Sequence, residues 1–258
     1  MTDHPIRFFS HAPPGQTFKR DWTDVYLSEF PVAYRDELMG RCQIHAKDGI
    51  LRELFDREIL APLQAWAEAE PLFCVDLLSA YGDSFLATVH GMTPEEIFEA
   101  WSTPEKSLTG LKPRRFPCRT LGIDLSGPAL GYGQRAGIFD DTLAVNINAL
   151  SADERVTLAH ALGRCHYLHL GAPGYIGLDG FRFIVDAFAA GSGPGYLVVA
   201  FNYLFMAHHK AFKQCIVETL RFINCVGGMQ RYLLPDEVAH YGVSCAYSTT
   251  WVMERKRP

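Results

Sequence analysis

The sequence predicts an α/β fold in which helices cover both faces of a mostly parallel sheet. Apolar runs typical of buried strands occur at residues 72–78, 119–126, 142–148, 165–171 and 195–205. Helix-forming stretches separate these runs, and a strand that returns through a helix to its neighbour pairs with it in parallel. In such sheets ligands bind beyond the carboxyl ends of the strands, so we expect functional residues at that edge.

Several helix starts are marked by their residue pattern. Thr93 is an N-cap followed by a proline at the first helical position and by Glu96, which closes a capping box. A second capping box begins at Ser151. Pro128 opens a short helix that we expect Gly137 to end.

Two later segments complete the predicted sheet and its cover. Residues 176–190 predict a helix with buried positions at Phe181, Phe183, Ile184 and Phe188. Residues 245–253 alternate with a period of two, which predicts a late strand with one covered face. One face of that strand carries Cys245, Tyr247, Thr249, Trp251 and Met253.

The N-terminal part has a different pattern from the rest. Residues 1–20 are rich in Pro, Gly and His and predict an irregular arm. From about residue 33 to 69 apolar residues recur at spacings of three and four, and Pro62 kinks or divides the helical segment that this predicts. We therefore expect an arm and helical cap over residues 1–69, and residues 70–258 to form the sheet-containing domain within one structural unit.

Composition excludes several classes of protein. The chain has 258 residues, is 48% hydrophobic and carries a formal net charge of −5, which disfavours a nucleic-acid-binding surface. Its 7 cysteines form no C-x-x-C motif and predict reduced thiols rather than disulfides or a zinc site. We find neither a signal peptide nor an apolar run that could span a membrane, so we expect a cytoplasmic protein without membrane or nucleic-acid partners.

Histidines offer candidates for catalysis but not for a metal site. His166 and His169 are three residues apart on a predicted strand, so their side chains point to opposite faces and cannot share an ion. We interpret both as ordinary strand histidines and expect no metal. His208 and His209 follow the fifth strand, where either could act as a general base or lie in an exposed polar loop.

Two further groups could contact a substrate. Glu29, flanked by Tyr26 and Tyr34, lies in the predicted cap, where an acid among aromatic rings could bind an amine or anchor a cap helix. Arg114 and Arg115 belong to a basic run that is either a solvated loop or a contact for an anionic substrate.

Four segments, in order, resemble a known family. "VDLLSAYGDSFLA", "GIDLSGPALGYGQRAGIFDD", "VNINAL" and "LHLGAPGYIG" are similar to the motifs of class I S-adenosylmethionine-dependent methyltransferases. The resemblance spans about residues 25 to 256, and its most specific parts are Tyr81-Gly82 and the "GID…PALGY" segment. It implies a Rossmann-like class I methyltransferase fold, with a seven-stranded, mostly parallel sheet whose last strand is antiparallel.

The resemblance also implies roles for particular residues. The cofactor's amino-acid end would lie against residues 76–82, Asp124 would bind the ribose hydroxyls, and Asn146 would lie near the adenine. Residues 171–175 would line the floor near the transferred methyl group. The predicted cleft residues in these segments, with Asn202 added at the end of the fifth strand, are Asp76, Ser79, Tyr81, Gly82, Asp124, Asn146, Gly171, Tyr175 and Asn202.

The first loop departs from the family pattern. Leu78-Ser79-Ala80-Tyr81-Gly82 has one glycine where a nucleotide cradle needs several, because side chains keep the backbone amides away from the ligand. Leu78 would project a branched side chain into the cofactor's place. Spacing alone also allows Asp124 to be the cap of the helix that begins near Pro128.

Three functional hypotheses follow. The first is an enzyme of natural-product biosynthesis that works without S-adenosylmethionine, similar in its altered first motif to the paired methyltransferase-like proteins that close the aziridine-containing ring of azinomycin-type products. There an internal amine displaces a leaving group, with Glu29, His208 or His209 as candidate base and Arg114 and Arg115 as contacts for the departing anion. Its substrate would be a small molecule, free or bound to a carrier protein, and its partner a homologous subunit or a second copy. The alternatives are an active S-adenosylmethionine-dependent small-molecule methyltransferase and a catalytically silent stabilising subunit.

Overall fold

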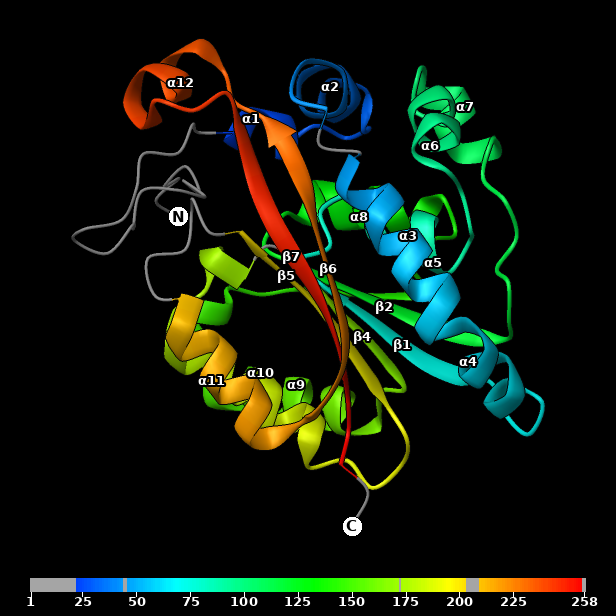
Figure 1. Cartoon of the computed structure of the whole chain (residues 1–258). Helices are drawn as coiled ribbons and strands as arrows, with labels where there is room; N and C mark the ends of the chain where they lie inside the picture. The colour runs from blue at the N-terminus through cyan, green and yellow to red at the C-terminus, as the bar shows by residue number, and fades with distance from the viewer. Residues whose placement is uncertain (1–21, 44–45, 172, 203–208, 257–258) are drawn as a thin grey trace.

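The computed structural model describes residues 22–43, 46–171, 173–202 and 209–256, and in this part of the chain seven strands form one sheet (Figure 1). The order across the sheet is β3-β2-β1-β4-β5-β7-β6, with β1 to β5 parallel and β7 antiparallel to both β5 and β6. This is the sheet that the resemblance implied, and it confirms the predicted Rossmann-like methyltransferase fold. The strands are β1 Leu72–Leu77, β2 Cys118–Asp124, β3 Asp141–Ala144, β4 Tyr167–Leu170, β5 Tyr196–Asn202, β6 Arg221–Tyr232 and β7 Cys245–Glu254.

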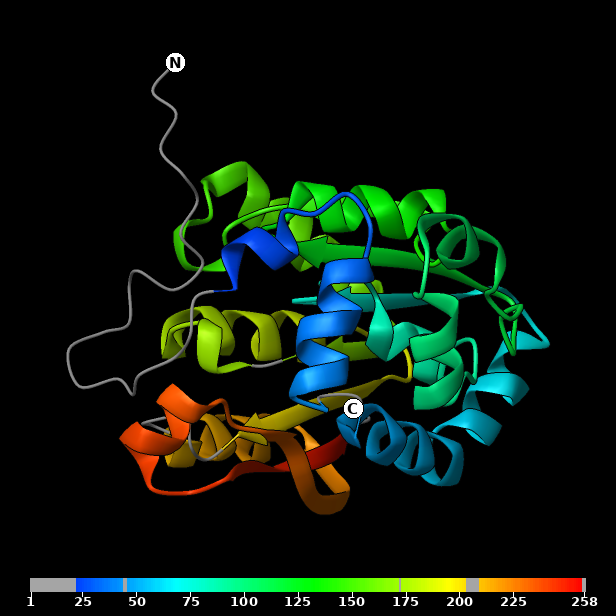
Figure 2. The same cartoon turned by 90° about the horizontal axis from the view of Figure 1, so that it is seen from above.

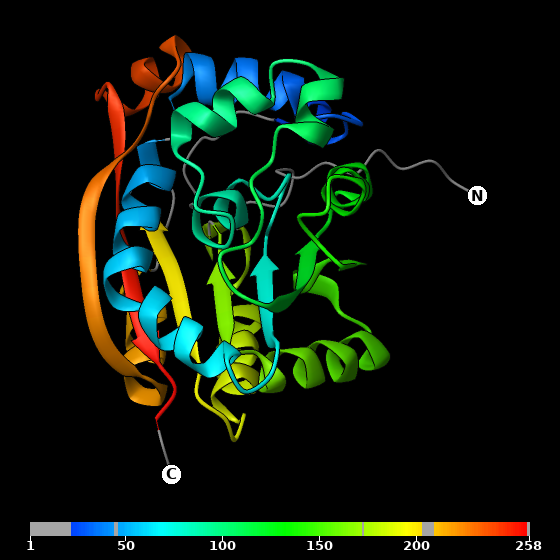
Figure 3. The ribbon, with the colours of Figure 1, turned by 90° about the vertical axis from the view of Figure 1, so that its right-hand side faces the viewer.

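Helices cover both faces of the sheet, and α1 and α2 lie above the carboxyl ends of the parallel strands (Figures 2 and 3). One face packs against α3 and its neighbours, and the other against α9, α10 and α11. No helix in the described ranges is both long enough and apolar enough to cross a bilayer. The α-helices are α1 Thr23–Tyr26, α2 Val32–Tyr34, α3 Ala46–Glu58, α4 Leu60–Ala67, α5 Asp83–Thr88, α6 Pro94–Ala100, α7 Pro104–Thr109, α8 Gly127–Arg135, α9 Ala152–Arg164, α10 Leu178–Ala189, α11 His209–Thr219 and α12 Pro235–Tyr241, with a π-helix at Arg35–Arg41 and 3₁₀ turns at Ile147–Ala149 and Pro173–Tyr175.

The helix starts that the sequence marks are present. Thr93 and Ser151 each form a capping box with the glutamate three residues later. Gly137 follows α8 with a left-handed φ of 74°, which glycine adopts without steric cost. The cap segment divides at Ile59, so Pro62 falls in the first turn of α4, where a missing amide costs little.

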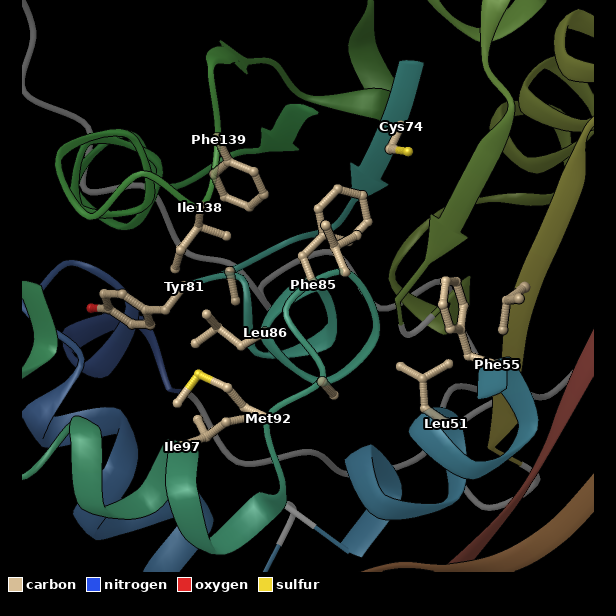
Figure 4. Close-up of a cluster of buried hydrophobic side chains, with 14 of the residues drawn as sticks. Leu51, Phe55, Cys74, Tyr81, Phe85, Leu86, Met92, Ile97, Ile138 and Phe139 are labelled. Carbon is tan, nitrogen blue, oxygen red and sulfur yellow. The ribbon is translucent and has the colours of Figure 1, made fainter. Parts of the chain in front are cut away.

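The cap and the sheet share one hydrophobic cluster (Figure 4). Leu51 and Phe55 of α3 pack with Phe85 of α5 and with Tyr167 of β4. Cys74 belongs to the same cluster, whereas its neighbour Val75 belongs to the cluster on the opposite face of the sheet. This alternation fixes which strand residues face α3, including those of the candidate site.

Three segments differ from the sequence prediction. The third strand ends at Ala144 rather than near residue 148, because the Asn146 side chain accepts a hydrogen bond from the Asn148 amide and caps a 3₁₀ turn. Phe183 of α10 is only half-buried, although the other three predicted positions of that helix are buried. The sequence analysis also missed β6, a long strand at the edge of the sheet whose polar residues and Gly227-Gly228 pair hide the pattern.

The last strand is covered mainly on one face, as its period of two predicts. The covered face is, however, opposite to the one that carries Cys245, Tyr247, Thr249 and Trp251: Ala246, Ser248, Thr250 and Val252 are buried, whereas Tyr247 is 60% exposed. The predicted irregular arm at residues 1–20 lies outside the described residues.

Candidate active site

Polar side chains replace apolar ones near the carboxyl edge of the sheet, on the face toward α3. Asp76 of β1 and His169 of β4 are direct neighbours in the parallel register and therefore stand on the same face. Both are buried, and His169 Nδ1 lies 2.7 Å from Asp76 Oδ1. Burial raises the pKa of the Asp76 carboxyl, and His169 partly offsets that rise.

Helices α3 and α5 bring three more charged groups to this place. Lys47 Nζ lies 3.1 Å from Asp83 Oδ2 and 3.6 Å from Asp48 Oδ1. The Tyr34 hydroxyl donates a hydrogen bond to Asp83 Oδ2 at 3.0 Å. We call Lys47, Asp48, Asp76, Asp83 and His169, together with Tyr34, the polar layer.

Asp48 is the least compensated member of the polar layer. Its side chain is 0% exposed, and neither carboxyl oxygen has a hydrogen-bond partner among the described residues. Burial raises the pKa of Asp48 to about 8, and the carboxyls of Asp83 and Asp76 add to the rise while Lys47 opposes it. Near neutral pH this carboxyl is therefore mostly protonated. Lys47 behaves in the opposite sense, because Asp83 and Asp48 outweigh burial and raise the pKa of its ammonium.

The His169–Asp76 pair has the arrangement of an oriented general base. The carboxylate engages Nδ1, and no residue in the described part of the chain hydrogen-bonds to Nε2. In such pairs the carboxylate fixes the ring and stabilises the imidazolium that forms when the other nitrogen takes a proton. The interpretation of His169 as an ordinary strand histidine missed this, because only the register of β1 against β4 brings it to Asp76.

The loop after β1 has an unusual backbone. Leu78 and Ala80 adopt left-handed φ values of 61° and 48°, and Gly82 has a φ of 86°. The loop thus keeps a glycine-type conformation with two residues for which it costs roughly 1 to 2 kcal/mol each. The Leu78 side chain is half-buried and packs into the core on the α9–α10 face.

Hydrogen bonds within the protein use most of this loop's amides. Four of its five N–H groups are engaged: those of Leu78 and Ser79 by the Ile123 carbonyl, that of Ala80 by Asp124, and that of Gly82 by the Ser79 carbonyl. The second oxygen of Asp124 accepts from the Ser126 amide at 2.9 Å. Each oxygen of Asp124 keeps a second lone pair, so the poor fit to S-adenosylmethionine rests on the loop, because a nucleotide cradle needs free amides.

Tyr81 fastens the N-terminal segment over the same loop. Its hydroxyl lies 2.7 Å from both the Val25 and Ser28 carbonyl oxygens, and the Ser126 hydroxyl donates to the Tyr26 carbonyl. Tyr34 packs edge-on against Tyr26 and Tyr81. Tyr81 is buried and holds the cap in place rather than facing an open cleft.

Other predicted residues lie apart from the polar layer. Glu29 is exposed, with 71% of its side chain accessible, and pairs with Arg135 at 3.4 Å. Arg114 binds Asp140 and the carbonyl of Cys118, the first residue of β2, which places it toward the opposite edge of the sheet. Arg115 binds Asp56 and the carbonyl of Thr88, the last residue of α5. Both arginines have structural partners.

The remaining predicted residues lie at or near the carboxyl edge. Asn146 is exposed and caps its 3₁₀ turn, while Asn148 joins the loops after β3 and β4 through Tyr175 and Gly177. Gly171 approaches the first loop so closely that a Cβ atom on it would lie 2.9 Å from the Leu78 carbonyl oxygen.

Asn202, at the end of β5, is buried opposite Ser248, and Ser79 has a buried hydroxyl without a partner in the described chain. His209 begins α11, whereas His208 lies outside the described residues.

Two further features of the described residues bear on ligand binding. No three of their His, Cys, Asp and Glu side chains gather closely enough to hold a metal ion. An open groove of about 430 Å³ lies beside α6 and α7, and two of its three acids, Glu96 and Glu99, are paired with Lys112 and Lys106. The groove shares no residue with the polar layer.

Comparison with solved structures finds similar chains among methyltransferases. A magnesium protoporphyrin IX methyltransferase from Synechocystis has a TM-score of 0.47 and 12% identity, with 90% of this chain and 94% of that chain covered. The cyclase SpnF has a TM-score of 0.47 and 10% identity, with 80% and 81% covered. A geranyl diphosphate C-methyltransferase from Streptomyces coelicolor has a TM-score of 0.43 and 12% identity, with 74% and 79% covered. No family model and no curated protein matches the sequence. At these identities the likeness concerns the fold and says nothing about substrate or cofactor.

Proposed function

We propose that this chain is a small-molecule enzyme of methyltransferase fold that works without S-adenosylmethionine and uses His169 as a general base. The observation that carries the proposal is the buried pair of His169 and Asp76, in which Nε2 of the imidazole has no partner among the residues that the structure describes. It lies at the carboxyl ends of β1 and β4, where sheets of this kind bind their ligands.

The reaction that this base suits is displacement by an amine. The substrate's ammonium gives a proton to Nε2 of His169, and Asp76 stabilises the imidazolium that results. The freed nitrogen then forms a bond to carbon, while the bond from that carbon to the leaving group breaks and its electron pair departs with the anion. When nucleophile and leaving group belong to one molecule, the product is a small nitrogen ring such as an aziridine.

Independence from S-adenosylmethionine is supported by the first loop. Four of its amides and both oxygens of Asp124 already have partners within the protein. A cofactor would have to compete with these hydrogen bonds, and each amide that it released would need a new acceptor.

Metabolite profiles of the native host test the proposal. Three strains are compared with the wild type: one without the gene, one with His169→Asn, and one with the control His166→Asn. The His166 imidazole, just before β4, accepts a hydrogen bond from the Phe73 amide of β1. We expect the first two to accumulate the same amine-bearing precursor, and the control to make the product. The product should equal that precursor minus the leaving group as its acid. A product heavier by one methyl group, still made by His169→Asn, would contradict the proposal.

One observation favours the alternative of an active methyltransferase. Leu78, Ala80 and Gly82 keep the left-handed backbone of a glycine loop, and the Leu78 side chain turns into the core instead of blocking the loop. The methyl-group mass difference in the same experiment decides between the two functions.

A further inference from the structure

We propose that Asp48 anchors the ammonium group of the substrate, so that the polar layer selects primary amines. The inference rests on the proposed function, which supplies the base for that amine. It adds the class of ligand and the group that recognises it.

Both carboxyl oxygens of Asp48 can accept hydrogen bonds, but neither has a donor among the described residues. The carboxyl faces Lys47 Nζ at 3.6 Å, which is beyond hydrogen-bond contact, and both of its oxygens lack donors among the described residues. Buried polar groups in proteins are almost always hydrogen-bonded, so a buried carboxyl without a donor needs an explanation. A ligand with several N–H donors supplies what is missing.

Two further buried groups near the carboxyl edge of the sheet have acceptor capacity to spare as well. Asp76 Oδ2 and the Ser79 hydroxyl are buried and without partners in the described chain. Asp76 lies close enough to Asp48 for its carboxyl to raise the pKa of Asp48. Ser79 is three residues after Asp76 in the sequence. An ammonium group has three donors and no acceptor, which matches a set made of carboxylate and hydroxyl oxygens.

The balance of charge also favours a cation. Three carboxyls, those of Asp48, Asp76 and Asp83, share the polar layer with Lys47 and with the imidazole of His169. Asp83 is engaged by Lys47 at 3.1 Å and by the Tyr34 hydroxyl, so Asp48 shares its counter-charge, Lys47 at 3.6 Å, with a closer carboxyl. Lys47 is 21% exposed, whereas Asp48 is fully buried, so the lysine is the member of this pair that reaches solvent.

Binding must then release a proton from the protein. Burial raises the pKa of Asp48 to about 8, with Asp83 and Asp76 adding to the rise and Lys47 opposing it. An alkylammonium keeps its charge over this range and binds the ionised carboxylate. Its affinity therefore increases about tenfold for each unit by which pH rises toward the pKa of Asp48, and levels off above it. Tyr34 and Tyr26 also face these carboxyls, but both stay neutral because burial raises their pKa values.

The experiment is a titration of the full chain with n-propylamine, followed through the amide signals of Asp48, Gly49 and Asp83 by nuclear magnetic resonance. n-Propanol is the uncharged counterpart of the same shape. Asp48→Asn removes the anchor, and Glu53→Gln, an exposed acid on the same helix, is the matched control. We expect propylamine to bind wild type and Glu53→Gln alike, to bind Asp48→Asn at least tenfold more weakly, and propanol not to bind.

Equal binding of propylamine and propanol, or undiminished binding to Asp48→Asn, would overturn the inference. If Asp48→Asn does not fold, the wild type decides alone, since a flat affinity between about pH 6 and about pH 8 contradicts an ionising anchor. The proposed base is judged separately by the metabolite profiles of His169→Asn. A negative propylamine titration therefore rejects the role of Asp48 without affecting the role of His169. Metabolite profiles that reject His169 likewise leave the titration result valid.

Discussion

His169 and Asp76 form a hydrogen-bonded pair because β1 and β4 place them side by side in the parallel register. Apolar residues, Cys74 and Tyr167, occupy the preceding positions on the same sheet face. A carboxyl group in such surroundings is costly to bury, and its partner histidine and the nearby Lys47 offset part of the cost. The functional proposal rests on these buried polar groups because they lie at the edge of the sheet where ligands bind.

The stability of the protein should depend on pH through Asp48. The folded state holds a proton on this carboxyl up to about pH 8, whereas the unfolded chain loses it near pH 4. The free energy of unfolding therefore falls as pH rises between these values, by up to about 1.4 kcal/mol per unit from this group. Asp48→Asn removes that dependence. Urea unfolding measures the free energy of unfolding of both proteins from about pH 5 to about pH 8. The stability of Asp48→Asn relative to wild type should increase with pH, and a constant difference would contradict the environment described for Asp48.

The strained loop should be relieved by glycine. Ala80→Gly removes a Cβ from a left-handed residue, and we expect the free energy of unfolding to rise by about 1 kcal/mol after the entropic cost of glycine. Gly82→Ala is the reverse test, because its Cβ would lie 2.8 Å from a methyl carbon of Ile138 at a φ of 86°. Denaturant unfolding measures both, and a destabilised Ala80→Gly would show that the loop is not strained there.

Tyr81→Phe should loosen the N-terminal segment. The change removes the hydroxyl that lies against the Val25 and Ser28 carbonyls, at a cost of about 1 kcal/mol. Hydrogen exchange should become faster in residues 22–34. Tyr132→Phe is the matched control, since it loses a buried hydroxyl that binds the Ser107 carbonyl and keeps the ring that packs against Phe30. Equal exchange in the two variants would mean that Tyr81 does not hold the cap.

Arg114→Ser should destabilise the protein rather than weaken binding of an anion. Arg114 binds Asp140, Thr120 and the carbonyls of Cys118 and Gly137, so we expect a loss of about 2 kcal/mol. Arg119→Ser is the control: this arginine is 68% exposed and pairs with Asp141, and its loss should cost under about 1 kcal/mol. Equal losses in thermal unfolding would contradict the structural role of Arg114.

Local sequence patterns predicted much of the fold, because buried strands, caps and helix starts depend on residues that are close together in the sequence. The boxes at Thr93 and Ser151 are of this kind. β6 was missed because its residues are polar or glycine and it is stabilised by pairing with β7, which a local pattern does not contain.

The site was harder to predict because it is built by long-range contacts. Asp76 was found as part of a motif, but His169 joins it only through strand register, and Asp48 only through the packing of α3. Glu29 and the two arginines were chosen for chemistry and position along the chain. Their charged partners, Arg135, Asp140 and Asp56, are distant in sequence, so the pairing was invisible before the fold was known.

The most direct test of the central claim is a calorimetric titration of the purified protein with S-adenosylmethionine and with S-adenosylhomocysteine. Because four of the five amides of the first loop already have partners within the protein, we expect no binding heat up to millimolar concentration of either nucleotide. A micromolar dissociation constant for either one would contradict the proposed independence from S-adenosylmethionine and favour the alternative of an active methyltransferase.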